Sequence, residues 1–268
     1  MSAAKVRFCL LDCEHAVEEG KPVVRLWGRT DTGKTVCVLD AGFRPSLYVE
    51  PKKNAGDLAA ELRAAAVAEE LPDGRVVERK PERAEVVRRT FLGTEKQVVQ
   101  VTLTVPADVP KFRELVKSWG SVAECYEYAV PFAKRYLIDR GLVPLEWVEA
   151  EGEPVQGSGL RADIVLAASA VKPVKAAAEA APRFRVLAFD IELIERPAEQ
   201  VIMVSLADSE GYRRVLAVGG AAAAAPPDVE LVESERALLE RFLALVQERD
   251  PDIVAGYNSD RFDFAKVG

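Results

Sequence analysis

The sequence is poor in the residues that build zinc sites, disulfide frameworks and membrane spans. It has one histidine and four cysteines in 268 residues, and the cysteines lack the spacing of zinc ligands. We therefore expect no zinc site, and we expect reduced thiols. No apolar run reaches the roughly 18 residues that cross a bilayer, and the N-terminus, MSAAKVRFCLLDCEH, has acidic residues within its apolar stretch, unlike a secretion signal. These absences predict a soluble, cytoplasmic protein without membrane contact.

The chain is acidic overall, with 36 basic and 43 acidic residues and a net charge of −7. This balance argues against a protein that coats nucleic acid non-specifically, but it leaves local contacts open. Two segments are basic: residues 75–89 have six basic and three acidic side chains, and residues 130–140 have three and one. We interpret them either as solvated faces or as places that bind a phosphate backbone.

The first 150 residues predict a mixed α/β domain that opens with strands. Three early segments have strand composition, and the turn Asp-Thr-Gly predicts a hairpin between the second and third. Further along, strands and helices are expected in the order β-α-β-β-α-β, which is typical of ferredoxin-like and RNA-recognition-like modules. Asp108 is the expected N-cap of the second helix. The expected elements are strands at 6–12, 21–30, 34–40 and 44–50, a helix at 55–70, strands at 76–92 and 96–105, a helix at 109–119 and a strand at 121–130.

The composition changes between 151 and 183, where Gly, Pro, Ser and Ala cluster, and this predicts a connection between two domains. Residues 184–268 then predict a second α/β domain. Three strands in succession, a helix at 235–249 capped by Ser234 and a further buried strand at 252–258 indicate a mixed sheet of the ribonuclease-H type. The expected fold class is therefore α/β (α+β), with an N-terminal domain at 1–150 and a partial ribonuclease-H-like domain at 184–268.

Two acidic residues interrupt the almost continuous apolar run of the strand at 184–194. Asp190 and Glu192 are two residues apart, so both side chains point to the same face of the strand. A buried pair of like charges is costly unless a cation offsets it, and Mg²⁺ or Mn²⁺ prefers such carboxylate oxygens. Asp263, after the last strand, is the candidate third ligand. The alternative is that the two acids lie on an exposed edge or pair with arginine.

Longer phrases carry a resemblance to a known family. VLAFDIE and DPDIVAGYNSDRFDF resemble the first and second exonuclease motifs of family B DNA polymerases. EEGKPVVRLWGR, FRPSLYVEP, RTFLG, DVPKFRELV and EYAVPFAKRYLIDRGLVP resemble the N-terminal domain of archaeal family B replicative polymerases. The resemblance covers nearly the whole chain apart from residues 150–183. It implies DNA as partner, both as template and as a single-stranded 3′ end.

The resemblance also implies roles for single residues. Asp190 and Glu192 match the metal-binding acids of the first motif, and Asp263 matches the acid of the second, so that two Mg²⁺ (or Mn²⁺) ions in the completed site hydrolyse mismatched 3′ ends. Asn258 and Phe262 match residues that hold the site and the single-stranded end, although both also suit ordinary turn and core roles. The family often has Thr where this chain has Leu193, a position whose side chain matters little.

Archaeal members also resemble one another in a pocket that captures uracil in the template strand. The matching positions are Pro45, Val98, Phe132 and Arg135, where an apolar slot selects a flat base and the arginine holds a phosphate. A plain packing role for Val98 and Phe132 is the alternative. The chain departs from its relatives at three positions: His15 and Ser46 stand in place of Tyr, and Glu95 stands in place of Pro.

Parts of the family's machinery have no counterpart in the sequence. A third exonuclease motif, with its carboxylate and tyrosine, and the palm, fingers and thumb regions do not occur. We therefore expect little or no catalysis by this chain alone. The chain is expected to be one piece of a split polymerase completed by a second polypeptide, or else a shortened form of a longer one. A non-catalytic, uracil-sensing DNA-binding module is the alternative function.

Overall fold

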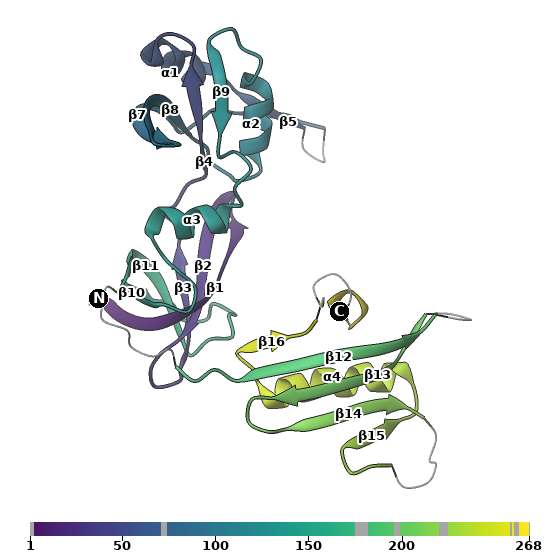
Figure 1. Ribbon diagram of the computed structural model, residues 1–268. Helices are drawn as coiled ribbons and strands as arrows, with labels where there is room; N and C mark the ends of the chain where they lie inside the picture. Colours follow the sequence, from purple (N-terminus) through teal and green to yellow (C-terminus); the bar gives the residue numbers. More distant parts are fainter. Residues whose placement is uncertain are drawn as a thin grey trace. The chain divides into compact units, whose positions relative to one another are not determined.

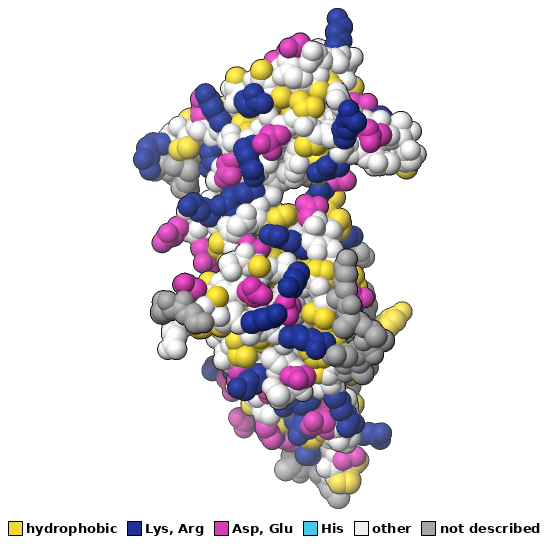
Figure 2. All heavy atoms as spheres, turned by 90° about the vertical axis from the view of Figure 1, so that its left-hand side faces the viewer, with side chains coloured by type: hydrophobic (Ala, Val, Ile, Leu, Met, Phe, Trp, Pro, Cys, Tyr) yellow, Lys and Arg dark blue, Asp and Glu magenta, His cyan; other side chains and the backbone are white. Residues whose placement is uncertain are grey.

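The computed structural model describes residues 3–70, 74–174, 182–195, 199–219, 225–257, 259 and 263–267 (Figure 1). It is a mixed α/β structure made mostly of strands, and its contacts divide it into two compact units, residues 1–182 and 183–268. No helix in these ranges is long and apolar enough to cross a membrane. On the face in Figure 2, Lys and Arg side chains are interspersed with Asp and Glu side chains.

A closed five-stranded barrel forms one part of the first unit. Its core combines barrel side chains such as Phe8 and Leu26 with Phe132 and Tyr136 of helix α3. Each such apolar side chain contributes roughly 1.5–3 kcal/mol when fully buried. The strands, in barrel order, are β1 (Ala4–Glu18), β10 (Trp147–Pro154), β11 (Ile164–Pro173), β3 (Thr35–Asp40) and β2 (Lys21–Arg29), and α3 spans Phe132–Arg140.

The segment 151–183, which composition predicts to be a connection, contributes the end of β10 and all of β11 to this barrel. β10 runs on to Pro154 and pairs with β1, and β11 pairs with both β10 and β3. The small residues there reflect close packing of strands, because a Cβ at Gly152 would lie 2.0 Å from the carbonyl oxygen of Ala167. Gly152 sits at an irregularity of the β10–β11 ladder, a common place for glycine in a strand.

The other part of the first unit is a four-stranded antiparallel sheet covered on one face by two helices. Leu58 and Leu62 of α1 and Phe112 of α2 pack on Val99 and Val101 in its core. A short extra hairpin is inserted after α1. The sheet order is β7 (Arg83–Phe91), β8 (Thr94–Thr102), β4 (Ser46–Pro51) and β9 (Val122–Tyr126); the helices are α1 (Ala55–Ala64) and α2 (Asp108–Val116), and the hairpin is β5 (Val67–Glu70) with β6 (Val76–Arg79).

Three local expectations for this sheet are wrong. The first helix ends at Ala64, because the β-branched Val67 begins a strand that pairs with β6. The long strand expected at 76–92 is two strands, interrupted around Pro81, which cannot donate to a ladder. Asp108 does not cap α2: the N-cap is Ala107, and the Asp108 carboxylate accepts hydrogen bonds of 2.7 and 2.9 Å from Arg79.

The second unit is a five-stranded mixed sheet with helix α4 on one face (Figure 1). Leu238, Phe242 and Leu245 of α4 pack on the buried side chains of the sheet. The Ser234 hydroxyl accepts a hydrogen bond of 3.2 Å from the Ala237 amide, so the expected N-cap is confirmed. The sheet order is β15 (Val229–Val232), β14 (Arg213–Val218), β13 (Gln200–Asp208), β12 (Val186–Ile194) and β16 (Ile253–Ala255); α4 spans Glu235–Arg249 and α5 spans Asp263–Val267.

Strand direction in this sheet is mixed. β12, β13 and β14 are antiparallel neighbours, while β16 pairs with β12 and β15 pairs with β14 in parallel. β15 and β16 are the two edge strands, and α4 carries the chain across one face of the sheet from β15 to β16, where it pairs in parallel with β12. β15 is a strand that the sequence pattern alone does not predict, because its four residues follow an alanine- and proline-rich stretch.

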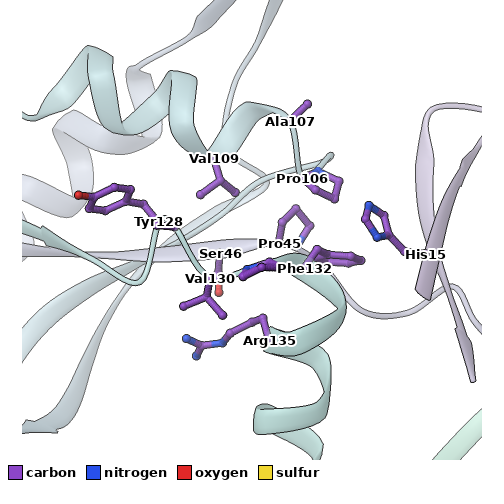
Figure 3. A pocket seen from close by; sticks show the side chains of 12 residues that line it. His15, Pro45, Ser46, Pro106, Ala107, Val109, Tyr128, Val130, Phe132 and Arg135 are labelled. Carbon is purple, nitrogen blue, oxygen red and sulfur yellow. The ribbon is translucent and has the colours of Figure 1, made fainter. Parts of the chain in front are cut away.

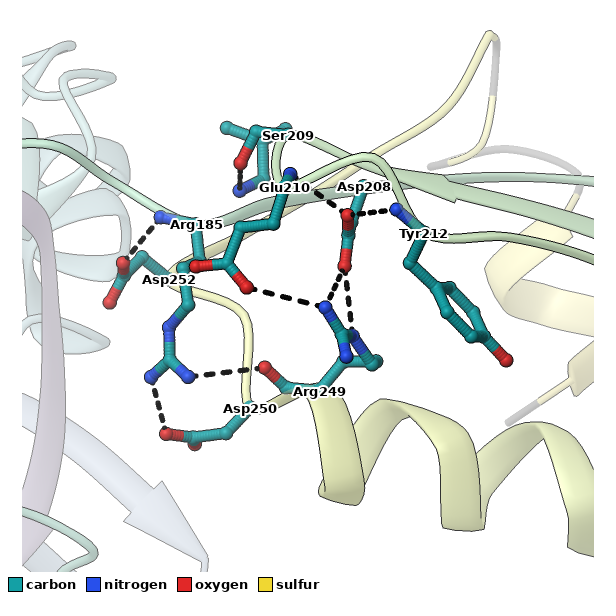
Figure 4. Close-up of polar contacts among 9 residues, drawn as sticks. Arg185, Asp208, Ser209, Glu210, Tyr212, Arg249, Asp250 and Asp252 are labelled. Carbon is teal, nitrogen blue, oxygen red and sulfur yellow. Dashed lines mark hydrogen bonds and ion pairs between the residues drawn. The ribbon is translucent and has the colours of Figure 1, made fainter.

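A polar network joins the turn after β13 to the end of α4 (Figure 4). The Asp208 carboxylate accepts hydrogen bonds of 2.8 and 2.6 Å from the Arg249 guanidinium and one of 2.8 Å from the Tyr212 amide. Nearby, Arg185 donates to Asp250 at 2.8 Å. These contacts hold the C-terminal end of α4 against the end of the sheet at which β12 and β16 begin.

Candidate functional site

Strand β12 presents two carboxylates on the sheet face opposite α4. Leu187, Phe189 and Ile191 alternate with them and are buried beneath the helix, whereas Asp190 and Glu192 are exposed. Neither acid has an ion-pair partner in the part of the chain that the structure describes. The two acids are therefore not a buried pair, because no described helix covers this face. The side chains of Asp190 and Glu192 lie on the same face of the strand, as the period-two alternation predicts.

β12 lies between β13 and β16 rather than at an edge of the sheet. Asp190 is opposite Ser205 and Glu192 is opposite Met203 on β13. The Ser205 hydroxyl donates a hydrogen bond of 3.4 Å to the backbone carbonyl of Asp190, so it leaves the carboxylate unengaged. Two unpaired carboxylates on one face of a strand offer the hard oxygen ligands that Mg²⁺ and Mn²⁺ take.

Asp263 is the first residue of α5, and its side chain is 2% exposed. Its Oδ2 atom has no hydrogen-bond partner among the described residues, and neither has the buried Ser259 hydroxyl. A buried carboxylate oxygen without a partner is costly, so this atom is suited to a cation or another donor. Phe264 packs on Phe189 with ring centroids 5.3 Å apart, which places the start of α5 beside β12.

The three acids do not form a ready metal cluster. Among the residues in the described ranges, no three His, Cys, Asp or Glu side chains lie close enough to share an ion. Asp190 and Glu192 share one face, and Asp263 is on a neighbouring element with its side chain buried. Asn258 and Phe262, predicted to contact the single-stranded end, lie outside the described residues. The donor chemistry fits a hard divalent ion, and the joint coordination by all three acids stays a prediction.

A groove of about 690 Å³ lies on the same face of the sheet as Asp190. The sequence patterns did not single out two of its residues, Arg213 and Tyr257. The period-two alternation of the last strand is the signal that could have indicated Tyr257: continued two residues past Ala255, it predicts that Tyr257 is on the same face as Ala255. Other lining residues include Ala188, Asp190, Ser205, Ala207, Val215, Asp228 and Ala255.

The first unit has a separate cavity of about 390 Å³ (Figure 3). Pro45, Phe132 and Arg135 line it, as the resemblance implies, but Val98 does not. Val98 is fully buried within β8, so its part in a uracil pocket stays a prediction. Further lining residues are His15, Ser46, Pro106, Ala107, Val109, Tyr128, Ala129, Val130 and Pro131.

Two of the three positions that depart from relatives lie in this cavity. The His15 ring meets Phe132 edge to face, with centroids 5.1 Å apart, and Ser46 lies beside Pro45 (Figure 3). Glu95 is instead exposed on β8, where it pairs with Arg88 at 3.4 Å. The substitutions at His15 and Ser46 therefore affect which ligand the cavity accepts, whereas Glu95 does not line the cavity.

Arg135 is held firmly at the cavity wall. Its guanidinium donates to the Tyr48 hydroxyl at 2.8 Å and to Asp139 at 2.9 Å, and it forms an ion pair with Glu127. Burial alone would lower the pKa of Arg135, but the hydrogen bonds and charge interactions with Asp139 and Tyr48 together outweigh it and leave the pKa above its ordinary value. A phosphate at this wall would therefore compete with carboxylates that already neutralise the charge.

Residues 123–267, just over half of the chain, match the family model for the exonuclease domain of family B DNA polymerases. The chain is 34% identical over 261 residues to a DNA polymerase of Desulfurococcus sp. (strain Tok), covering 96% of this chain and 28% of that one. It is 34% identical over 261 residues to a DNA polymerase of Thermococcus kodakarensis, covering 96% of this chain and 13% of that one. The chain thus spans less than a third of these relatives.

A solved structure agrees with these similarities. The family B DNA polymerase from the hyperthermophilic archaeon Pyrobaculum calidifontis is 30% identical, with a TM-score of 0.73 over 98% of this chain and 32% of that one. The chain belongs to DNA polymerase family B, as the sequence motifs indicate. It corresponds to the N-terminal portion of the archaeal members and includes the start of their exonuclease domain.

Proposed function

We propose that this chain contributes template binding and part of a 3′–5′ proofreading exonuclease site to a family B DNA polymerase. The observation that carries the proposal is the position of Asp190 and Glu192: two exposed, unpaired carboxylates share one face of β12, within the matched exonuclease region. The sheet order supports a ribonuclease-H-like domain, and the order of β4 to β9 supports a ferredoxin-like module.

In this proposal Asp190 and Glu192 hold one or both of two Mg²⁺ or Mn²⁺ ions, and Asp263 completes the set after a local adjustment that turns its buried oxygen toward them. When bound, such ions activate water and stabilise the leaving oxygen of a phosphodiester. Asn258 and Phe262 contact the single-stranded 3′ end. Further polypeptide, on a second chain or on a longer form of this one, supplies the remaining exonuclease motif and the polymerase domain.

The test is hydrolysis of single-stranded DNA in Mg²⁺ by this chain together with the rest of the polymerase. Asp190→Asn or Glu192→Gln is expected to lower the rate about 100-fold or more, because each removes a metal ligand. Glu233→Gln, an exposed acid before α4, is the matched control and should leave the rate unchanged. Equal rates for the wild type and the double variant Asp190→Asn/Glu192→Gln would refute the ligand assignment.

A second role, sensing of uracil in the template, is supported by the cavity at Pro45, Phe132 and Arg135. We propose that an unstacked base enters between the apolar walls and that Arg135 contacts the adjoining phosphate, in competition with its present carboxylate partners. The role requires no metal, so it would persist if the exonuclease proposal failed.

Titration of uracil- and thymine-containing single strands in EDTA tests this role. The wild type is expected to bind the uracil strand at least about tenfold more tightly, and Phe132→Ala should remove that preference. Val98→Ala should preserve it, because Val98 lies outside the cavity wall. Equal affinities of the wild type for the two strands would remove the uracil interpretation.

A further inference from the structure

The basic segment 75–89, which the sequence leaves open as a solvated face or a phosphate contact, lies on β6 and β7 of the first unit. Arg88 in this segment is already neutralised, because it pairs with Glu95 at 3.4 Å. Arg89 points to the opposite face of β7, is exposed, and forms no ion pair with any described residue. It donates to neutral acceptors, the Tyr48 hydroxyl at 3.3 Å and the Arg88 carbonyl at 3.0 Å among them. Its positive charge is therefore available to an anionic ligand.

Tyr48 connects Arg89 to the cavity of the first unit. Its buried ring lies on the sheet face opposite α1 and α2. The guanidinium carbons of Arg89 and Arg135 each lie 5.3 Å from the centroid of this ring, and the Tyr48 hydroxyl accepts hydrogen bonds from both, at 3.3 and 2.8 Å. Arg135 lines the cavity. One neutral side chain thus holds two cations, of which Arg135 is neutralised by Asp139 and Glu127 and Arg89 is not.

Polar side chains continue from Arg89 toward the cavity on the same face of the sheet. The Gln100 amide oxygen accepts a hydrogen bond of 3.5 Å from Arg89, and the Gln100 amide nitrogen donates one of 3.5 Å to the Ser46 hydroxyl. Ser46 lines the cavity beside Pro45. A row of hydrogen-bonding groups therefore joins the cavity to an uncompensated cation. When a base occupies the cavity, the backbone on one side of that base can follow this row to Arg89.

The acids of this face limit the strength of such a site. Glu50 is neutralised by Lys96, whose ammonium lies 2.9 Å from the carboxylate. Glu85, opposite Gln100 in the ladder, and Glu124 have no ion-pair partner in the described ranges. The face is therefore not strongly basic, and we expect one phosphate contact of modest strength rather than a series of them.

We propose that Arg89 binds one of the two backbone phosphates that flank a template base held in the cavity, and that Tyr48 positions Arg89 for this contact. The inference rests on the proposed base-sensing role and goes beyond it, because that role assigns a phosphate to Arg135 alone. A phosphate reaches Arg135 only in competition with two carboxylates, whereas it reaches Arg89 without displacing any. Arg89 thus supplies the charge of the site, and Tyr48 transmits its position to the cavity wall.

Replacement of single phosphates by neutral methylphosphonates locates the contact. Single strands that contain one uracil, neutralised at the phosphate on its 5′ or its 3′ side, are titrated with the full chain in EDTA. For one of the two strands, the wild type should bind about fivefold more weakly than it binds the natural strand, the range of an exposed ion pair. Arg89→Gln should bind that strand and the natural strand with equal affinity. A methylphosphonate far from the uracil is the control, and its effect should be the same in the wild type and in Arg89→Gln.

The salt dependence of binding tests the charge of the contact. Arg89→Gln should reduce the slope of log affinity against log salt by about 0.7, the loss of one phosphate on a single strand, and Arg89→Lys should restore the slope because it keeps the charge. Arg88→Gln, on the other face of β7, is the matched control and should leave the slope unchanged. Tyr48→Phe keeps the ring and both cations but removes the shared hydroxyl. It should weaken binding without changing the slope, as expected of a positioning residue.

The outcomes separate this inference from the proposed function. Methylphosphonate effects that are the same in the wild type and in Arg89→Gln would overturn the contact, even if the uracil strand is still preferred to the thymine strand. An effect that persists in Arg89→Gln and disappears in Arg135→Gln would assign the phosphate to Arg135 and would also overturn it. Conversely, a slope reduced by Arg89→Gln but not by Arg88→Gln, in a chain that binds uracil and thymine strands equally, would support the phosphate contact and remove the uracil interpretation.

Discussion

At the scale of single residues, Asp208 shows how charge is used to fasten the second unit. Burial alone would raise the pKa of Asp208, but the hydrogen bonds from the Tyr212 amide, the Arg249 guanidinium and the Glu210 amide together lower it. A carboxylate with a lowered pKa contributes stability at pH values above its unfolded pKa, near 3.9. That contribution disappears as the pH falls through the folded pKa.

Asp208→Asn should therefore destabilise the second unit at pH 7 by roughly 1–3 kcal/mol, and the difference from wild type should vanish toward pH 2–3. All three tryptophans (Trp27, Trp119 and Trp147) lie in the first unit, so their fluorescence does not report this change. Hydrogen exchange of peptides from β13 and β14 reports the stability of the second unit and therefore measures this change. A difference in protection between variant and wild type that stays constant from pH 7 to pH 3 would contradict the assignment.

Single residues also show which features of the candidate site the sequence predicts and which it does not. Period-two alternation placed Asp190 and Glu192 on one face of a strand, and the structure agrees. Their exposure could not be read, because it depends on which face α4 covers. The sequence alone does not predict the place of Tyr257, because an aromatic after a short apolar run is also typical of a core; the structure puts it in the groove that Asp190 also lines. The burial of Asp263 depends likewise on tertiary packing, in which its neighbour Phe264 contacts Phe189.

At the scale of elements, composition was a good guide to strong periodic segments and a poor one to glycine- and alanine-rich ones. Helix α4 begins and ends where its cap and its apolar stripe predict. β11, by contrast, looked like part of a connection, because its small residues follow a Gly- and Ser-rich stretch. The structure shows how closely β11 packs on its neighbour β10: a Cβ at Gly152 of β10 would lie 2.0 Å from the carbonyl oxygen of Ala167 in β11. Tertiary contact, rather than local preference, decides such segments.

Asp108 illustrates the same limit for a helix terminus. An acidic residue before an apolar stripe is a common N-cap, but a nearby arginine offers a stronger partner. Asp108 is 1% exposed and binds Arg79 of the extra hairpin through two hydrogen bonds. The sequence pattern predicts the end of one helix and the start of one strand where the structure has the hairpin, so it does not predict the contact between Arg79 and Asp108.

At the scale of the whole molecule, the motifs identify the family, and the comparisons confirm it across 96–98% of the chain. The two units carry separate candidate sites: a base-sized cavity in the first and a carboxylate-bearing groove in the second. Each is built from residues of its own unit. The proposed functions can therefore be tested one at a time, by variants in one unit that leave the other untouched.

The central claim is that exposed carboxylates on β12 are ligands for a divalent ion. A titration of the full chain with Mn²⁺ tests this claim. The electron paramagnetic resonance signal of the free ion measures how much Mn²⁺ is bound, and the measurement does not require a completed nuclease. The wild type and Glu233→Gln should remove Mn²⁺ from solution with equal affinity, and Asp190→Asn/Glu192→Gln should bind at least about tenfold more weakly. Identical titrations for the double variant and the wild type would contradict the claim.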